Sequence, residues 1–136
     1  MSDLTRDRRE MLANMTPVPD PETYHFCVTR DPALAARVAP AALATFREAE
    51  GITLVLPRAE AVRFGFDTGL PMTRIVLTVH SALDGVGLTA GVATALAEAG
   101  IPCNMIAAYH HDHVFVPREM AANALILLRA AQEAAR

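Results

Sequence analysis

The sequence predicts an α/β fold of the α+β sandwich kind, with antiparallel sheets covered by helices on one face. Strand-like and helix-like segments alternate along all 136 residues. In addition, a pattern of an apolar strand, Pro-Arg and a helix start occurs twice, 60 residues apart. Leu54, Pro57 and Arg58 of the first copy correspond to Val114, Pro117 and Arg118 of the second. We therefore expect two related halves, the first of them truncated. A chance match is the alternative, because proline often begins a helix after a strand.

The first elements of the chain are expected to be a helix, a connector and a strand. Residues 2–14 carry apolar side chains at the spacing of an amphipathic helix. The segment TPVPDPE, residues 16–22, is rich in proline and indicates a stiff connector. Residues 24–30 alternate between apolar and other side chains, which favours a strand.

The rest of the first half is expected to contain two short helices around a hairpin. We expect helices at residues 31–40 and 57–65 and the antiparallel strands of the hairpin at residues 42–50 and 51–57. Asp31 can cap the first helix, and Gly51 allows the positive φ of a tight turn. Residues 66–74 are the expected boundary between the halves.

The second half reads strand, helix, strand, strand, helix. We expect these elements at residues 74–80, 88–99, 101–109, 113–117 and 119–134. A split βαββαβ sheet would then lack its last strand, which must come from the first half or from another subunit. The predicted domains are residues 1–70, an N-terminal half with a leading helix, and residues 71–136, a C-terminal domain.

Composition excludes several classes of protein. Hydrophobic residues make up 52% of the chain and charged residues 20%, so a core can form. A net charge of -3 with scattered basic residues argues against a nucleic-acid partner. The sequence shows neither a secretory signal nor an apolar run long enough to span a membrane. Cys27 and Cys103 fit reduced core thiols, so we expect a cytoplasmic protein with no membrane contact.

A glycine-containing loop before the helix at 88–99 is the first candidate binding site. Its residues are Asp84, Gly85, Val86, Gly87 and Leu88. Free N–H groups at a helix start favour a carboxylate or phosphate, and Asp84 could meet an ammonium group. The alternative is that Asp84 caps the helix and the glycines only form the turn. Asn104, in the next strand, must bind either neighbouring backbone or a ligand.

A turn rich in histidine is the second candidate site. His110, His111, Asp112 and His113 are chemically a metal-ligand set, and His111 and His113 share one face of a strand. The alternatives are a polar or pH-sensitive turn, since no matching Cys or Glu cluster stands elsewhere. In the first hairpin, Glu48 and Glu50 beside Arg47 fit a solvated face better than acid–base catalysis. No catalytic or cofactor motif is evident, so we expect no enzyme and no cofactor.

The segment LDGVGLTAGVATALAEAGIPCNMIA resembles the core of an ACT domain. The wider pattern, with MTPVPDPETYHFCV, TFREAEGITLVLP and CNMIAAYHHDHVFVP, is similar to small bacterial proteins made of tandem ACT-like units. This resemblance implies ferredoxin-like βαββαβ units, which commonly bind amino acids at paired-domain interfaces and regulate an enzyme. It also implies that Asp84–Leu88 contact the backbone of a ligand and that Asn104 contacts its amine or side chain.

The resemblance predicts a regulatory sensor of a small molecule, an amino acid, that acts without catalysis. Apolar residues on both faces of the strands at 75–79 and 101–109 favour a homodimer. No catalytic domain is attached, so the regulated partner would be a separate, unidentified protein. The histidine turn is not part of the general ACT pattern, which leaves two alternatives: a metal-binding protein or metal-dependent enzyme that uses His110–His113, and a structural adaptor without ligand.

Overall fold

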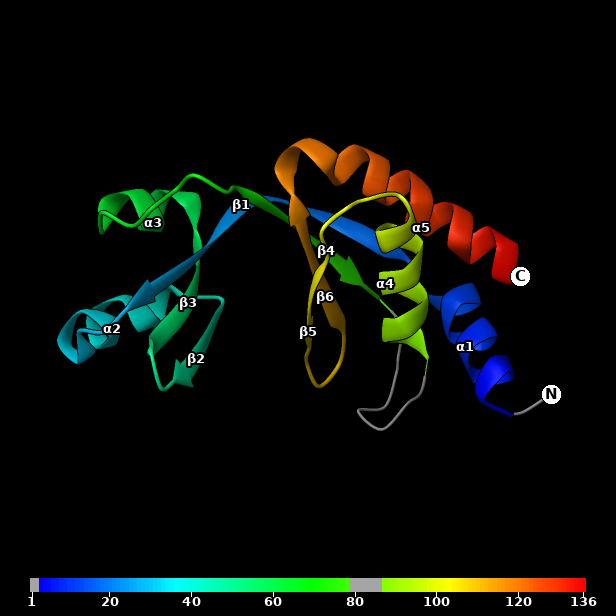
Figure 1. The fold of residues 1–136 in the computed structure, drawn as a ribbon, viewed down its shortest axis with the longest axis horizontal. Coiled ribbons are helices and arrows are strands. Elements are labelled where there is room, and N and C mark those ends of the chain that lie inside the picture. Colours follow the sequence, from blue (N-terminus) through cyan, green and yellow to red (C-terminus); the bar gives the residue numbers. More distant parts are fainter. Residues whose placement is uncertain (1–2, 79–86) are drawn as a thin grey trace. The chain divides into compact units, whose positions relative to one another are not determined.

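The computed structural model describes residues 3–78 and 87–136 (Figure 1). The chain forms two compact units, each described here by itself. Unit 1 combines Met1–Asp20 with Thr73–Arg136, and unit 2 is Pro21–Met72. The domain boundary at residue 70 stays a prediction.

Unit 1 is a sheet covered by helices. Its helices are α1 (Asp3–Asn14), α4 (Leu88–Glu98) and α5 (Ala121–Ala135), the last preceded by the 3-10 turn η2 (Arg118–Met120). Its strands are β4 (Met72–Leu77), β5 (Asn104–Ala107), β6 (Asp112–Pro117) and the first residues of β1 (Pro17–Thr29). The strand order is β1-β4-β6-β5, so the strand nearest the N-terminus completes a sheet whose other members come from the second half of the chain.

Unit 2 is smaller and has three strands. The later residues of β1 are followed by α2 (Pro32–Val38), η1 (Ala39–Ala41), β2 (Ala44–Glu48), β3 (Gly51–Pro57) and α3 (Arg58–Arg63). Here the strand order is β2-β3-β1, with both neighbouring pairs antiparallel. The two units confirm the predicted α+β architecture of tandem ferredoxin-like units with a shorter first unit.

Contacts at the start of β1 show how the missing strand of unit 1 is supplied. The Thr16 carbonyl accepts a hydrogen bond from the Thr78 N–H at 3.0 Å. Four residues later, Asp20 accepts two bonds from the Arg74 guanidinium, at 2.6 and 3.0 Å. Because residue numbers rise on one strand as they fall on the other, β1 runs antiparallel to β4. The last strand therefore comes from the first half of the same chain, one of the two predicted sources.

The prediction of a connector at residues 16–22 is wrong, because β1 begins at Pro17. Neighbouring residues of a strand direct their backbone polar groups to opposite edges. The backbone groups of Thr16 point toward β4, so the backbone groups of Pro17, Pro19 and Pro21 point toward the opposite edge. The missing N–H groups of these prolines therefore remove no hydrogen bond between β1 and β4. The pairing of β1 with β3 starts only at Tyr24, beyond these prolines.

The internal repeat is visible in the pairing of two hairpins. In unit 2, the pairs of β2 and β3 run from Ala44↔Val55 to Glu48↔Gly51. In unit 1, the pairs of β5 and β6 run from Asn104↔Phe115 to Ala107↔Asp112. Four of the five pairs of the first hairpin become the four pairs of the second when both residue numbers are raised by 60. The repeat is therefore structural and not a chance match of letters.

The strand expected from residue 101 starts only at Asn104, because Ile101 belongs to the end of α4. Gly100 has φ +72° and donates to the Ala97 carbonyl at 2.9 Å. The Ile101 N–H reaches back to the Leu96 carbonyl at 3.0 Å, and the Ile101 side chain is buried. This is the Schellman motif, in which glycine takes the left-handed position and a following apolar residue packs against the helix.

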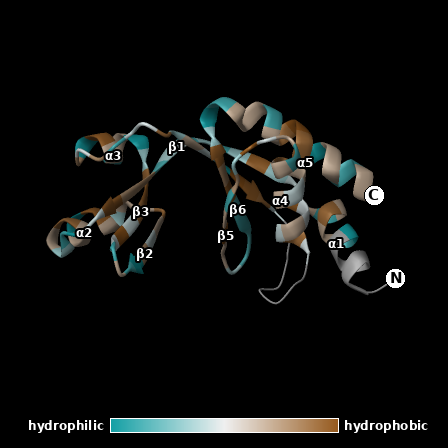
Figure 2. Ribbon diagram, viewed as in Figure 1, coloured by the Kyte–Doolittle hydropathy of each residue, from teal (hydrophilic) through white to brown (hydrophobic). Residues whose placement is uncertain are grey.

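Each unit has its own hydrophobic core. In unit 1, Ile75 and Leu77 of β4 pack with Val92, Leu96 and Leu128 of α4 and α5, all fully buried. Along α5, hydrophobic and hydrophilic bands alternate, as expected of a helix with one buried face (Figure 2).

In unit 2, Cys27, Leu54 and Leu56 on the sheet meet Val38 and Ala61 on the helical layer. The two cores share no residue. Within the described ranges, no helix is both long and apolar enough to cross a membrane.

Leu128→Ala should lower the free energy of unfolding by about 2–5 kcal/mol, because it leaves a cavity in the core of unit 1. The matched control is Ile126→Ala on the same helix, whose side chain is 63% exposed and should change stability by less than about 0.5 kcal/mol. Urea unfolding of both variants checks the difference. Equal effects of the two substitutions would contradict the packing described for α5.

Arg74→Met should lower the free energy of unfolding by about 1–3 kcal/mol, because Asp20 loses two charged donors at a site where both side chains are less than 20% exposed. Arg63→Met is the control: its ion pair with Glu60 is 3.7 Å long, with the Arg63 side chain 72% exposed. Such a pair contributes at most about 1 kcal/mol. If both variants lose the same small amount, the tie between β1 and β4 is not a major source of stability.

Candidate functional site

The predicted ligand loop lies only partly within the described residues. Asp84, Gly85 and Val86 are outside them. Gly87 precedes α4 with φ +104°, a left-handed conformation that favours glycine, and its position offers no side chain to cap the helix. Leu88 is 3% exposed and belongs to the core of unit 1, so it can offer a ligand its backbone N–H but not its side chain.

Asn104 is exposed and opens strand β5, opposite Phe115. Its neighbour Met105 packs against the core of unit 1, so Asn104 lies on the sheet face away from the helices. Helix α4 runs back along the sheet, and β5 therefore starts near the last turn of α4 and not near its first (Figure 1). Within one copy of unit 1, the structure does not bring Asn104 next to Gly87.

The histidine turn joins β5 to β6. The Ala108 N–H donates to the His111 carbonyl at 3.0 Å, and Tyr109, 76% exposed, packs edge-on against His110. His113 is half-buried in β6, with its Nδ1 at 3.4 Å from the Arg74 Nη1. Among the residues that the structure describes, no three His, Cys, Asp or Glu side chains are grouped as a metal site would require.

The charges around His113 disfavour a second cation there. Burial lowers the pKa of His113, and the Arg74 guanidinium lowers it further. Burial also raises the pKa of Asp112, whose side chain is 6% exposed, against the opposing effect of His113 and His111. A guanidinium beside the imidazole repels a metal ion as it repels a proton. His111 and His113 are thus a poor pair of metal ligands in this arrangement.

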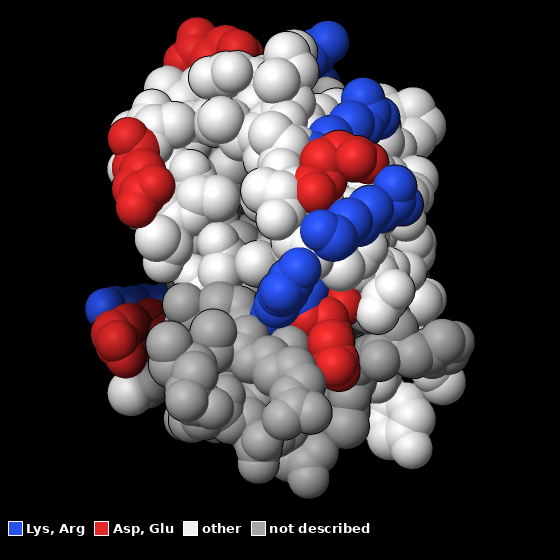
Figure 3. All heavy atoms as spheres, turned by 90° about the vertical axis from the view of Figure 1, so that its right-hand side faces the viewer, with Lys and Arg blue, Asp and Glu red and all other residues white. Residues whose placement is uncertain are grey.

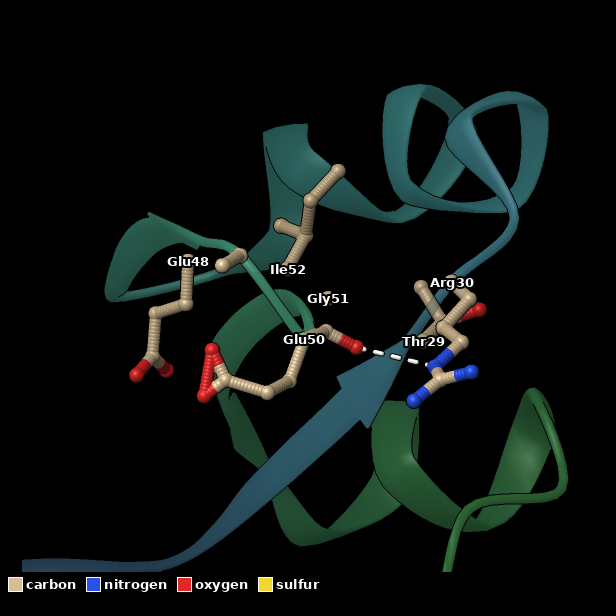
Figure 4. Close-up of a pocket in the computed structure, with 7 residues that line it drawn as sticks. Thr29, Arg30, Glu48, Glu50, Gly51 and Ile52 are labelled. Atoms are coloured by element: carbon tan, nitrogen blue, oxygen red, sulfur yellow. Dashed lines mark hydrogen bonds between the residues drawn. The ribbon is translucent and has the colours of Figure 1, made fainter.

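The equivalent turn of unit 2 borders a cavity of about 430 Å³ (Figure 4). It is lined by Thr29, Arg30, Glu48, Ala49, Glu50, Gly51 and Ile52. Arg30 follows the end of β1, and its Nε donates to the Glu50 carbonyl at 3.0 Å. Glu48 accepts a 2.6 Å bond from the Thr53 hydroxyl. The 60-residue repeat places the glutamate turn of unit 2 where unit 1 has its histidine turn.

The cavity combines charges of both signs. Arg30 supplies a guanidinium, while Glu48 and Glu50 supply carboxylates from the turn. A small molecule with both an acid and an amine could therefore find opposite charges within one site. Sequence reasoning assigned Glu48 and Glu50 to a solvated hairpin and missed Arg30, because Arg30 is 18 residues away from Glu48 and only the fold brings them together.

Burial also shifts the pKa values of His25, Cys27 and Cys103. His25 is 1% exposed with Nε2 at 3.5 Å from the Arg58 Nη1; burial, and then the charge of Arg58, lower its pKa. Burial raises the pKa of Cys27 to about 11 and also raises that of Cys103. Both thiols are therefore protonated near neutral pH, unlike reactive cysteines.

The surface over α1 and α5 carries mixed charges. On the face shown in Figure 3, acidic and basic side chains of the described residues lie interspersed among uncharged ones. Recognition of nucleic acid uses clustered positive charge, which this face does not display.

Two family models match the chain in tandem. Both are described as ACT domain, and they match residues 5–73 and residues 71–130. Their two matches together cover nearly the whole chain. No curated protein matches it.

The chain is also similar to solved structures. A Vibrio cholerae protein of unknown function, described as a possible transport protein, is 40% identical over 94% of this chain and 98% of its own, with a TM-score of 0.82. An Agrobacterium tumefaciens protein is 16% identical over 88% and 90%, with a TM-score of 0.70. The ligand-free regulatory subunit of aspartate kinase from Thermus thermophilus is 14% identical over 87% and 97%, with a TM-score of 0.65, which shows a shared fold. With both halves matched and both hairpins repeated, the chain belongs to the ACT domain family.

Proposed function

We propose that this protein is a cytoplasmic sensor that binds an amino acid and regulates a separate protein without catalysis. Membership of the ACT domain family supports a small-molecule-binding regulatory role. The observation that carries the proposal is the tandem of ACT matches over two units with the same hairpin register.

The proposed ligand site uses the loop before α4 and the start of β5. Asp84, Gly85, Val86, Gly87 and Leu88 would bind the ligand backbone, and Asn104 would bind its amine or side chain. Asn104 starts β5 near the far end of α4. We therefore propose a homodimer in which one ligand meets the loop of one copy of unit 1 and Asn104 of the other. Ligand binding would shift the packing of the two copies, and the regulated partner would respond to that shift.

The cavity of unit 2 supports an amino acid as the class of ligand. Arg30 can pair with a carboxylate, and Glu48 or Glu50 can pair with an ammonium group. This cavity is a second candidate position, equivalent in the repeat to the end of unit 1 that carries the histidine turn.

A thermal-shift screen of the twenty amino acids should find at least one that stabilises the protein. Ligand at 100 times its dissociation constant adds about 2.7 kcal/mol to the free energy of unfolding. Asp84→Ala should abolish this shift and leave the melting temperature without ligand unchanged. Arg30→Gln serves as the matched variant: loss of the shift in that variant alone would move the site to unit 2. A screen without any shift would favour the structural adaptor and contradict the proposal.

Purified protein should contain no stoichiometric metal, because the Arg74 guanidinium lies beside His113. Inductively coupled plasma analysis of the wild type and of a His111→Ala/His113→Ala double variant measures the metal content directly. Equal trace amounts in both proteins are the expected result. One metal ion per chain, lost in the double variant, would instead establish the metal-binding alternative.

A further inference from the structure

A histidine is buried within the core layer of unit 2. His25 lies on β1, directly opposite Leu56 and two residues before Cys27, and both of these residues belong to the core between the sheet and the helices. Alternation along the strand turns the His25 side chain to the same side as Cys27, where it is 1% exposed. A charged imidazole at such a position would have to be paired or hydrogen-bonded.

The contacts of the His25 ring require it to be neutral. Its Nε2 lies 3.5 Å from the Arg58 Nη1, and a guanidinium can only donate a hydrogen bond, so Nε2 must be the acceptor. The proton of the neutral ring is then on Nδ1, which has no hydrogen-bond partner among the described residues. An imidazolium carries an N–H on both nitrogens. Protonation would therefore point one N–H at another and place two positive charges side by side.

Among the residues that the structure describes, two charged groups act on His25 from different segments. Burial, and then the charge of Arg58 at the start of α3, lower the pKa of His25. Asp67, in the segment after α3, acts in the opposite direction, and the backbone of Leu70 does so more weakly. The Asp67 carboxylate is exposed and accepts a bond from the Gly69 N–H at 2.8 Å, so its own turn holds it. The net effect disfavours a second proton on the buried ring.

Helix α3 is the element that depends on this contact. It has six residues, its buried residue is Ala61, and Pro57 offers no side chain to cap it. Helices this short draw their stability from packing more than from their own hydrogen bonds. The contact between Arg58 and His25 ties the first residue of α3 to β1. Its loss would weaken the attachment of the helix, and with it the start of the segment that leads to β4.

We propose that His25 is an acid-sensitive switch: the neutral imidazole holds α3 against the sheet of unit 2, and a proton on the ring releases the helix. In the released form the imidazole meets water, where its pKa is about 6.5. The released form therefore binds a proton more readily than the closed form. Each pH unit below about 6.5 raises its population up to about tenfold, until the closed form is protonated as well. This switch does not rest on the proposed binding of an amino acid.

Hydrogen exchange at about pH 7.5 and about pH 5.5 tests the release. The amides to follow are those of Phe64, Gly65 and Phe66, which donate to carbonyls of α3. Their protection factors in the wild type should fall about tenfold at the lower pH. In His25→Gln they should change less than about twofold, because glutamine keeps an acceptor oxygen and does not titrate. His110→Gln is the control, because His110 is exposed in unit 1, and it should behave as the wild type does.

Two results of the exchange experiment would overturn the proposal. One is a wild type whose α3 amides are equally protected at both pH values. The other is a folded His25→Gln variant that loses as much protection in acid as the wild type.

A second variant tests the switch without altering the histidine. Arg58→Met removes the guanidinium, so the titration midpoint of the His25 ring, followed by its NMR signals, should move to higher pH, toward about 6.5. Arg63→Met is the matched control on the same helix: its side chain is 72% exposed, and the midpoint should stay that of the wild type. An unchanged midpoint in Arg58→Met, or an equal shift in both variants, would overturn the proposal. No amino acid is present in these experiments, so their outcome is independent of the ligand screen.

Discussion

Strand β1 is the constraint on which both units depend. Its first residues complete the sheet of unit 1 beside β4, and its later residues pair with β3 in unit 2. The Asp20–Arg74 pair and the Thr16–Thr78 bond hold the first part in register. Prolines at alternate positions remove hydrogen-bond donors from the edge that β4 does not use. One strand therefore contributes to both units, and the second half of the sequence cannot form unit 1 without the first.

The two hairpins show how one framework carries different chemistry. Four pairs of each hairpin coincide after a shift of 60 residues, and each second strand ends at a proline, Pro57 or Pro117. The turns differ: unit 2 presents Glu48 and Glu50 beside Arg30, and unit 1 presents histidines. Asp112, which is buried, and His113, which is half-buried, begin strand β6 and join the histidine turn of unit 1 to its sheet.

Local rules predicted most elements of the fold from the sequence. The Asp31 cap, Gly51 at the hairpin and the helix at residues 88–99 all follow from local chemistry, and the structure confirms them. The connector at residues 16–22 was wrong because proline is tolerated on a strand edge when its neighbour lies on the other side. That neighbour, β4, is more than 50 residues away in sequence. The predicted strand start at residue 101 was wrong because Ile101 instead caps the end of α4 through its bond to Leu96.

The candidate site was less accessible to sequence reasoning. Arg30 joins Glu48 and Glu50 only through the pairing of β1 with β3, which no local pattern reveals. Conversely, the sequence predicted that Asn104 and Gly87 bind the same ligand, but within one copy of unit 1 the length of α4 separates them.

The proposed binding of an amino acid is tested by titrating isotope-labelled protein with amino acids and following the amide chemical shifts. We expect one amino acid to shift a small set of amides that includes residues 84–88 and Asn104. Unchanged spectra with all twenty amino acids would contradict it.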